Sequence, residues 1–213
     1  MTKVIDWVEQ KLADDDDLKV IDRTAEDFLI VERKQGYTFN VAVIGIKGVV
    51  KDTDVLSLFE VADKPRLVVN VPSGVLWSGL AIGAIHANGA AFGTLGDINR
   101  AARTMDAGSF RNKNMQFFIN GMQQHDNVTS VSYVYDSVFR VDRVKGGSLT
   151  IAVIDAYNMS AEDVRNARTR IGNFDIVVKS TSYGSITTQA ESAATSMGAK
   201  ALMYRDLLVW LAR

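Results

Sequence analysis

The feature that most constrains this chain is a stretch of residues that occurs twice. Residues 28–44 read FLIVERKQGYTFNVAVI, and 110 positions later residues 138–154 read VFRVDRVKGGSLTIAVI. The two stretches are identical at six positions, including Gly36 with Gly146, whereas two unrelated stretches of this length would match at about one. A repeat at a fixed offset predicts that the chain contains two copies of one module.

The repeat extends over almost the whole chain. Upstream of residue 28 the offset stays at 110, and after residue 50 it becomes 109 and then holds to the end. One residue lost near position 50 explains both values. Because the polar, Gly-containing segment 105–113 separates the copies, we expect a first module over residues 1–107 and a second over residues 108–213. Matched pairs outside the central stretch include Val8 with Phe118, Asp54 with Asp163, Ser73 with Ser182 and Asp97 with Asp206.

Composition places the chain among globular proteins that bury a core. Of its 213 residues, 47% are hydrophobic and 23% are charged, and there is no cysteine, which excludes disulfides and thiolate metal sites. The first residues do not resemble a signal peptide and no apolar run is long enough to span a membrane, so we expect a cytoplasmic protein without a membrane partner.

Charge is shared unevenly between the copies. Residues 1–107 carry 12 basic and 16 acidic side chains, whereas residues 108–213 carry 12 basic and 9 acidic ones. Neither balance is typical of a protein that binds nucleic acid mainly by charge. The net charge of the second copy is compatible with a local basic patch.

Hydrophobic periodicity predicts a mixed α/β fold in each copy. The order is α-β-β-β-α-β-α-β-α, in which three antiparallel meander strands precede strands that enter through helical crossovers and therefore pair in parallel. The small residues of the expected helix over residues 76–89 predict a packing interface there. The expected elements of the first copy are helices 3–13, 53–62, 76–89 and 96–102 and strands 18–23, 28–34, 37–46, 66–71 and 90–93. Those of the second are helices 114–124, 160–171, 186–197 and 206–212 and strands 128–134, 138–144, 148–155, 174–180 and 199–204.

This order of elements resembles the restriction-endonuclease-like fold, the PD-(D/E)xK group, in which a helix precedes a three-strand meander that a helix and a further strand follow. The tail FDIVVKSTSYGSITTQAESAATSMGAKALMYRDLLVWL resembles the end of Mrr-type restriction endonucleases. The resemblance implies two tandem restriction-endonuclease-like modules that form a pseudo-dimer. It also implies a role on nucleic acid.

The chemistry of that family requires an acid near the start of the second meander strand and a Glu-x-Lys or Asp-x-Lys on the third, which together hold Mg²⁺ and orient water. Here the third strands read FNVAVIG and LTIAVID. Asp27 stands near the first position in one copy, and Asp136 and Asp155 stand near two positions in the other. Tyr157 occupies the place of the lysine, so neither copy has the complete set.

One alternative keeps an active nuclease. Asp22, Glu32 and Lys34 match the D-x9-E-x-K spacing if the sheet is read one strand earlier. Their repeat partners, Ser132, Asp142 and Val144, do not keep the pattern, and alternating charges are typical of a solvated strand edge. Only this alternative requires Mg²⁺; otherwise we expect no cofactor and no metal.

Other motifs are weaker. The acidic run 14–17 follows a helix, where it opposes the helix dipole and indicates a solvated turn rather than a metal site. His86 and His125 lie in different copies without a nearby cluster. The segments NVPSG and KSTSYGS follow strands and precede helices, so they either bind an anion or simply cap those helices.

The sequence therefore favours a non-catalytic nucleic-acid-associated or assembly subunit built from two degenerate nuclease-like modules. Its partners would be DNA or RNA. An alternative is a protein-interaction subunit of a larger oligomer, which docks a protein partner or a second copy through an apolar edge or the small-residue helix. The basic residues proposed to contact nucleic acid are Arg140, Arg143, Lys145, Arg165, Arg168, Arg170 and Lys179.

Overall fold

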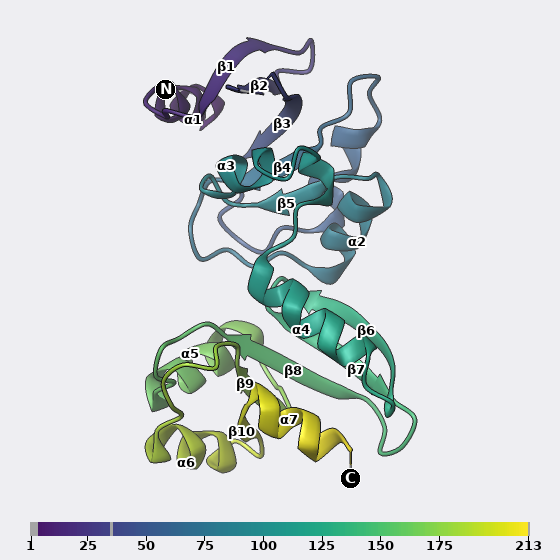
Figure 1. Cartoon of the computed structure of the whole chain (residues 1–213), viewed down its shortest axis with the longest axis vertical. Coiled ribbons are helices and arrows are strands. Elements are labelled where there is room, and N and C mark those ends of the chain that lie inside the picture. Colours follow the sequence, from purple (N-terminus) through teal and green to yellow (C-terminus); the bar gives the residue numbers. More distant parts are fainter. Residues whose placement is uncertain (1–3, 35, 213) are drawn as a thin grey trace. The chain divides into compact units, whose positions relative to one another are not determined.

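The computed structural model describes residues 4–34 and 36–212. They form two compact units, residues 1–112 and residues 113–213 (Figure 1). The break lies within the expected linker 105–113 and a few residues beyond position 107. The described ranges hold seven α-helices and two five-stranded mixed sheets, one sheet in each unit.

Unit 1 follows the expected order of elements. The expected helix and meander strands at its start are present. The residues Gln35 and Gly36 between the expected strands 28–34 and 37–46 predict a two-residue hairpin turn, and residue 35 lies outside the described residues. The elements are α1 (Val4–Ala13), β1 (Leu18–Arg23), β2 (Leu29–Arg33), β3 (Thr38–Ile44), the 3-10 helices η1 (Asp52–Asp54) and η2 (Leu56–Phe59), β4 (Leu67–Asn70), α2 (Gly79–Ala87), β5 (Ala91–Gly93), α3 (Asp97–Ala102) and the 3-10 helix η3 (Ala107–Ser109).

Unit 2 has an α-helix at each expected helical position. Its elements are α4 (Lys113–Gln123), β6 (Val128–Tyr135), β7 (Val138–Arg143), β8 (Leu149–Ile154), α5 (Ala161–Ile171), β9 (Ile176–Lys179), α6 (Thr188–Ser196), β10 (Lys200–Met203) and α7 (Tyr204–Leu211).

The two sheets share one topology, and the pairing register of β2 to β5 recurs in β7 to β10, whereas the β1–β2 and β6–β7 pairs have their bulges at different positions. Each has its strands in chain order, with an antiparallel meander followed by parallel strands, as expected. In unit 1, Leu29 pairs with Val41, which in turn pairs with Leu67. The corresponding partners in unit 2 are Phe139, Ile151 and Ile176. These residues are separated by the same offsets, 110 and then 109, that relate the two sequences.

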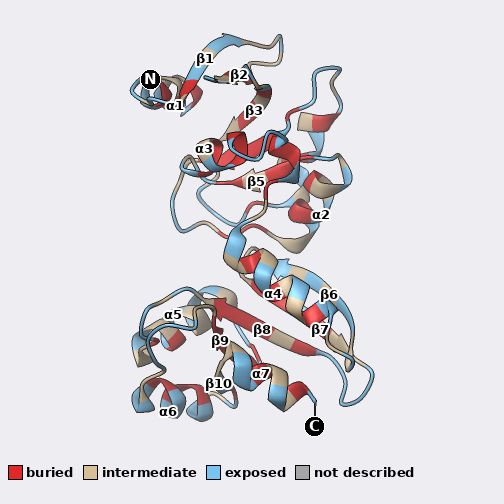
Figure 2. Cartoon of the chain, in the orientation of Figure 1, coloured by how far each residue is buried: buried red, intermediate tan, exposed pale blue. Residues whose placement is uncertain are grey.

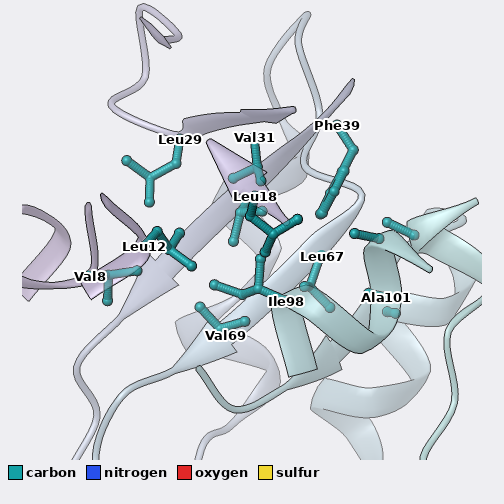
Figure 3. Close-up of a cluster of buried hydrophobic side chains, with 14 of the residues drawn as sticks. Val8, Leu12, Leu18, Leu29, Val31, Phe39, Leu67, Val69, Ile98 and Ala101 are labelled. Atoms are coloured by element: carbon teal, nitrogen blue, oxygen red, sulfur yellow. The ribbon is translucent and has the colours of Figure 1, made fainter. Parts of the chain in front are cut away.

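Each sheet is covered by helices on both faces. In unit 1, Val8 and Leu12 of α1 and Ile98 and Ala101 of α3 pack on the face that carries Val31, together with Leu18, Leu29, Leu67 and Val69 (Figure 3). In unit 2, α4 and α7 pack on one face and α5 and α6 on the other, so the central strands β7, β8 and β9 are buried (Figure 2). Each unit is therefore a three-layer α/β/α arrangement.

The expected helix over residues 53–62 was wrong. The chain forms η1 and η2 instead, with Val55 and Phe59 buried. The backbone N–H of Lys51 donates to the Asp54 carboxylate over 2.8 Å, which closes a tight turn at the start. Asp, Thr and Val are weak helix formers, and Pro65 follows soon after. The stretch therefore forms short 3-10 helices instead of one α-helix.

The second α-helix of unit 1 begins later than expected, and its small-residue face is only partly buried within the unit. Ser78 caps α2 by accepting a hydrogen bond from Ala81 N over 3.2 Å, so residues 76 and 77 precede the helix. Its buried residues are Ala81, Ile82 and Ile85, whereas Gly83 and Ala87 are exposed. The buried face of α2 therefore contains its larger apolar side chains, Ile82 and Ile85, because burying them removes more apolar surface from water.

Candidate functional site

The region of unit 2 best suited to bind a ligand is the end of its sheet at which the parallel strands β8, β9 and β10 terminate. The loops that follow β8 (residues 155–160) and β9 (residues 180–187) lie there, and the carboxyl ends of parallel strands are the usual place for ligands in α/β folds. A pocket of about 610 Å³ opens at this edge. It is lined by Asn114, Phe117, Ser180, Thr181, Ser182, Tyr183, Met203, Tyr204, Arg205 and Asp206. We call the two loops and this pocket the strand-end surface.

Hydrogen bonds join the two loops to each other. Asp155 accepts from Ser180 Oγ over 3.2 Å and from Asn114 Nδ2 over 2.7 Å, so it links both loops to α4. Asn158 Oδ1 accepts from Ser185 N over 2.9 Å, and Met159 N donates to Ser185 O over 2.9 Å. The loops are therefore fixed before any ligand arrives.

Gly184 allows the closest approach between the loops. Its φ is +76°, and a Cβ built there would lie 1.8 Å from the carbonyl oxygen of Tyr157. No side chain fits at that distance, so glycine is required for this contact. The contact places Tyr157 and Tyr183 on neighbouring, tightly packed backbone segments.

Lys179 lies beneath the second loop and holds it. The side chain is fully buried at the end of β9. Its Nζ donates to Thr181 O over 2.9 Å and also to Thr181 Oγ1 and Tyr183 O. Burial lowers the pKa of Lys179 below its ordinary value, and the Asp155 carboxylate partly opposes that shift. The ammonium thus acts as the internal anchor of residues 180–184.

Aromatic side chains stand exposed on this rigid support. Tyr157 is 73% exposed, Tyr183 is 76% exposed and Phe117 is 56% exposed. The ring of Phe117 packs on Tyr204, with 4.8 Å between ring centroids. Exposed aromatic rings on ordered loops are well suited to stack against a flat ligand, because ordering them on binding costs little entropy.

The charges at the strand-end surface are mixed. Asp155 and Asp206 are exposed carboxylates, and Arg205 is an exposed guanidinium at the start of α7. The first residues of α7 line the pocket, so the positive end of that helix dipole faces it. The surface therefore combines aromatic faces and hydrogen-bonding groups with charges of both signs.

The same edge of unit 1 is chemically different. Gly45 occupies the position of Asp155, Lys47 that of Tyr157 and Gly74 that of Tyr183. Asn70, which matches Lys179, is also buried, and it binds Ile46 N over 2.9 Å and Ile46 O over 3.0 Å. Both units therefore secure this edge from the same buried position, but only unit 2 presents tyrosines on it.

The seven basic residues predicted to contact nucleic acid lie in three places. Arg140, Arg143 and Lys145 belong to β7 and its turn; Arg140 pairs with Asp142 over 3.0 Å, and Arg143 packs over the Trp210 ring. Arg165, Arg168 and Arg170 lie on α5, where the Arg168 guanidinium lies over the ring of Phe174. Lys179 is buried, so it cannot contact a nucleic acid directly, because a strand-end lysine with three nearby oxygen acceptors is satisfied internally.

The alternative nuclease residues are spread along the first hairpin. Asp22 pairs with Ile30 and Glu32 pairs with Lys19, so the two carboxylates stand on different rungs of the β1–β2 ladder. Glu32 and Lys34 line a depression of about 570 Å³ with the acidic turn of residues 15–17. In that turn, Asp15 Oδ1 accepts from Asp17 N over 2.8 Å and from Leu18 N over 3.1 Å.

Asp27, the candidate first acid of unit 1, is bound to an arginine. It has a left-handed φ of +66° and pairs with Arg23 over 2.8 Å. Arg23 also binds Asp6, over 2.8 Å, and Glu9. The Arg23 guanidinium therefore binds the carboxylates near the position at which the family holds a metal. The neighbouring residues of the third strand, Val41 and Gly45, offer no side-chain oxygen as a ligand. The residues present at this place do not fit Mg²⁺.

Three negative findings bear on function. Within residues 4–34 and 36–212, no group of three or more His, Asp or Glu side chains is placed to hold a metal ion. No helix in those ranges has the length and apolar character needed to cross a membrane. No protein-family model, curated protein or solved structure matches the chain.

Proposed function

We propose that the chain is a non-catalytic nucleic-acid-associated protein, built from two degenerate restriction-endonuclease-like modules that form a pseudo-dimer, and that unit 2 binds a single strand. The observation that carries this proposal is the strand-end surface, where Tyr157 and Tyr183 stand exposed on two interlocked loops. In the family that the sequence resembles, this edge of the sheet is the reaction centre. Here Tyr157 takes the place of its lysine.

Stacking supports a single strand as the ligand. Proteins that bind single strands place aromatic rings where unpaired bases stack on them, and such stacking tolerates any base because every base has a π-face. A pocket of about 610 Å³ lies within the range of roughly 300–1,000 Å³ that is usual for small-ligand sites. The hydroxyl and amide groups of Ser182 and Asn114 at its wall supply hydrogen bonds to a base edge or to the backbone.

Charge argues against a duplex as the main ligand. Duplex binding depends on many phosphate contacts from basic side chains. The basic residues of unit 2 are divided among three places, and Arg140, Arg143 and Arg168 already contact other side chains of the unit. A single strand needs fewer such contacts because stacking supplies part of the affinity.

Removing the exposed rings tests the proposal. We expect Tyr157→Ala and Tyr183→Ala each to weaken the binding of a labelled single-stranded oligonucleotide by about 5- to 150-fold, because stacking on one aromatic ring contributes about 1–3 kcal/mol per base. Fluorescence anisotropy with DNA and RNA strands and with the matching duplexes measures the effect. Trp7→Ala, which removes a half-exposed ring from unit 1, serves as the matched control and should bind like the natural protein.

Two outcomes would contradict the proposed function. Failure of the natural protein to bind any strand at low salt contradicts the proposal outright. Equal affinity of both tyrosine variants and the natural protein contradicts the site. Metal-dependent cleavage of the oligonucleotide would instead favour the alternative that uses Asp22, Glu32 and Lys34.

Helix α5 offers a path for the phosphates beyond the tyrosines. Arg165 lines a shallow depression with Thr188 and Gln189, which directly follow the Tyr183 loop. We therefore expect the combined reversal Arg165→Glu, Arg168→Glu and Arg170→Glu to weaken binding and to lower the slope of log affinity against log salt by about 0.7 for each phosphate that the variant no longer neutralises. A parallel variant that keeps Arg168, and with it the packing on Phe174, controls for damage to the fold. An unchanged affinity and slope would show that α5 takes no part.

A further inference from the structure

One edge of the unit 2 sheet lacks two of the features that normally prevent strands from pairing between molecules, namely short length and charged side chains. Strand β6 is the outermost strand there and pairs with β7 on one side only among the described strands. It has eight residues, VTSVSYVY, none of which is charged, and it is exposed or half-exposed along its whole length (Figure 2). An edge strand carries a row of backbone N–H and C=O groups that another strand can bind.

The other three sheet edges are protected in familiar ways. Strand β5 has only three residues, and β10 has four, beginning with Lys200. Strand β1 has six residues and carries Lys19, Asp22 and Arg23. Short length and charged side chains are the usual means by which edge strands avoid association. Strand β6 is the longest of the four and has neither. Its pairing with β7 shifts register between Val128 and Ser130 and between Tyr133 and Tyr135, so residues 130–133 form its regular stretch.

The relation between the units makes this difference specific. At the offset of 110, Thr129 matches Lys19 and Ser132 matches Asp22. Both residues of unit 2 are exposed or half-exposed, as are their counterparts in unit 1. Asp22 and Ser132 also occupy equivalent rungs, since they pair with Ile30 and Arg140, whereas Thr129 lies in a bulge of β6. The fold therefore accepts a charge at the position of Ser132, yet unit 2 carries none there.

We infer that β6 pairs in antiparallel fashion with β6 of a second copy of this chain, which joins two unit 2 sheets into one continuous ten-stranded sheet. A two-fold axis perpendicular to the sheet places each residue of the strand opposite a residue of the same strand in the other copy. Because all eight residues are uncharged, no pairing of this kind brings like charges together, wherever along the strand the axis lies.

The same composition argues for a second copy rather than for a different partner. A foreign strand chosen for specificity would be expected to meet charges on β6 that match its own, and β6 has none. The Val, Thr and Tyr residues that make up most of the strand favour extended structure and pair well with one another across strands. This inference does not depend on the proposed binding of a nucleic acid.

The first test transfers the protection of β1 to β6. We expect the natural protein to have twice the monomer mass by light scattering after gel filtration, and the variant Thr129→Lys/Ser132→Asp, which adopts the residues of β1, to have the monomer mass. The control Asn166→Lys/Thr195→Asp places the same two charges on exposed sites of α5 and α6 and should remain a dimer. A natural protein that is monomeric at the highest soluble concentration, or a dimer that persists in the β6 variant, would overturn the inference.

The second test uses the absence of cysteine from the chain. Single variants Val131→Cys and Ser132→Cys introduce the only thiol, so any disulfide joins two molecules. Directly opposed residues of an antiparallel pair are close enough for a disulfide. We expect mild oxidation to produce a covalent dimer from the variant whose residue lies on or beside the two-fold axis. Thr195→Cys is the control and should not cross-link. Cross-linking no faster in the β6 variants than in this control would contradict pairing through this strand.

Discussion

Replacement of Lys179 with methionine is expected to lower the free energy of unfolding of unit 2 by about 2–4 kcal/mol, a large effect for a single substitution. Methionine fills most of the volume but donates no hydrogen bond. The carbonyl oxygens of Thr181 and Tyr183, which now accept from the ammonium, would lose that donor in a partly buried place. Each buried acceptor left without a donor costs about 1–3 kcal/mol.

The same change is expected to weaken single-strand binding, because residues 180–184 would no longer be held beneath Tyr183. Urea unfolding followed by the fluorescence of Trp210, in a background with Trp7→Phe and Trp77→Phe, measures the stability of unit 2. Lys200→Met, which removes an exposed lysine from β10, is the matched control and should change stability by less than about 0.5 kcal/mol. If Lys179→Met matched that control, the anchoring role of the ammonium would have to be abandoned.

Unit 1 is expected to lose about 2 kcal/mol of stability through His86 as the pH falls from 7 to 4. Burial, with a smaller contribution from Arg111, lowers the pKa of His86 from 6.5 to about 4. Between these values the unfolded chain binds a proton that the folded chain does not, so this contribution is complete above pH 6.5 and is lost as the pH falls toward 4. The full shift corresponds to about 3 kcal/mol, which we reduce because the imidazole keeps partial access to water.

Urea unfolding at a series of pH values, in a Trp210→Phe background that leaves the signal to the tryptophans of unit 1, tests this expectation. His86→Gln removes the titrating group, so its stability should change less with pH than that of the natural protein, by about the same 2 kcal/mol. His125→Gln changes the histidine of unit 2 and should leave the pH dependence of unit 1 as it is. Identical pH profiles for His86→Gln and the natural protein would exclude this histidine as the cause.

Much of the fold could be predicted because local pattern and global arrangement agree. The buried run of β4 and its counterpart β9 is too apolar and too short for a surface helix, and the meander follows from turn signals between alternating strands. The error at residues 53–62 has a physical cause. Val55 and Phe59 are spaced like one face of a helix, but the weak helix formers around them make each turn costly.

The candidate site was only partly visible in the sequence. The segment KSTSYGS stood out because it follows a strand and precedes a helix, and Tyr157 stood out because it replaces a lysine. Nothing in the local pattern reveals that Tyr157 and Tyr183 are exposed on joined loops, since that depends on Asp155 and Asn158 binding across the sheet edge. The burial of Lys179 was missed for the same reason: its acceptors belong to a loop whose path the sequence does not show.

The shared register of the two sheets has a consequence for engineering. Since the pairing of β2, β3 and β4 recurs in β7, β8 and β9, the loops that follow these strands can be exchanged between the units. Replacing residues 71–76 of unit 1 with residues 180–185 of unit 2, together with Asn70→Lys beneath them, would give unit 1 a tyrosine-bearing loop like that of unit 2. Exchanges of this kind, made one segment at a time, would give a protein in which both units present the same loop.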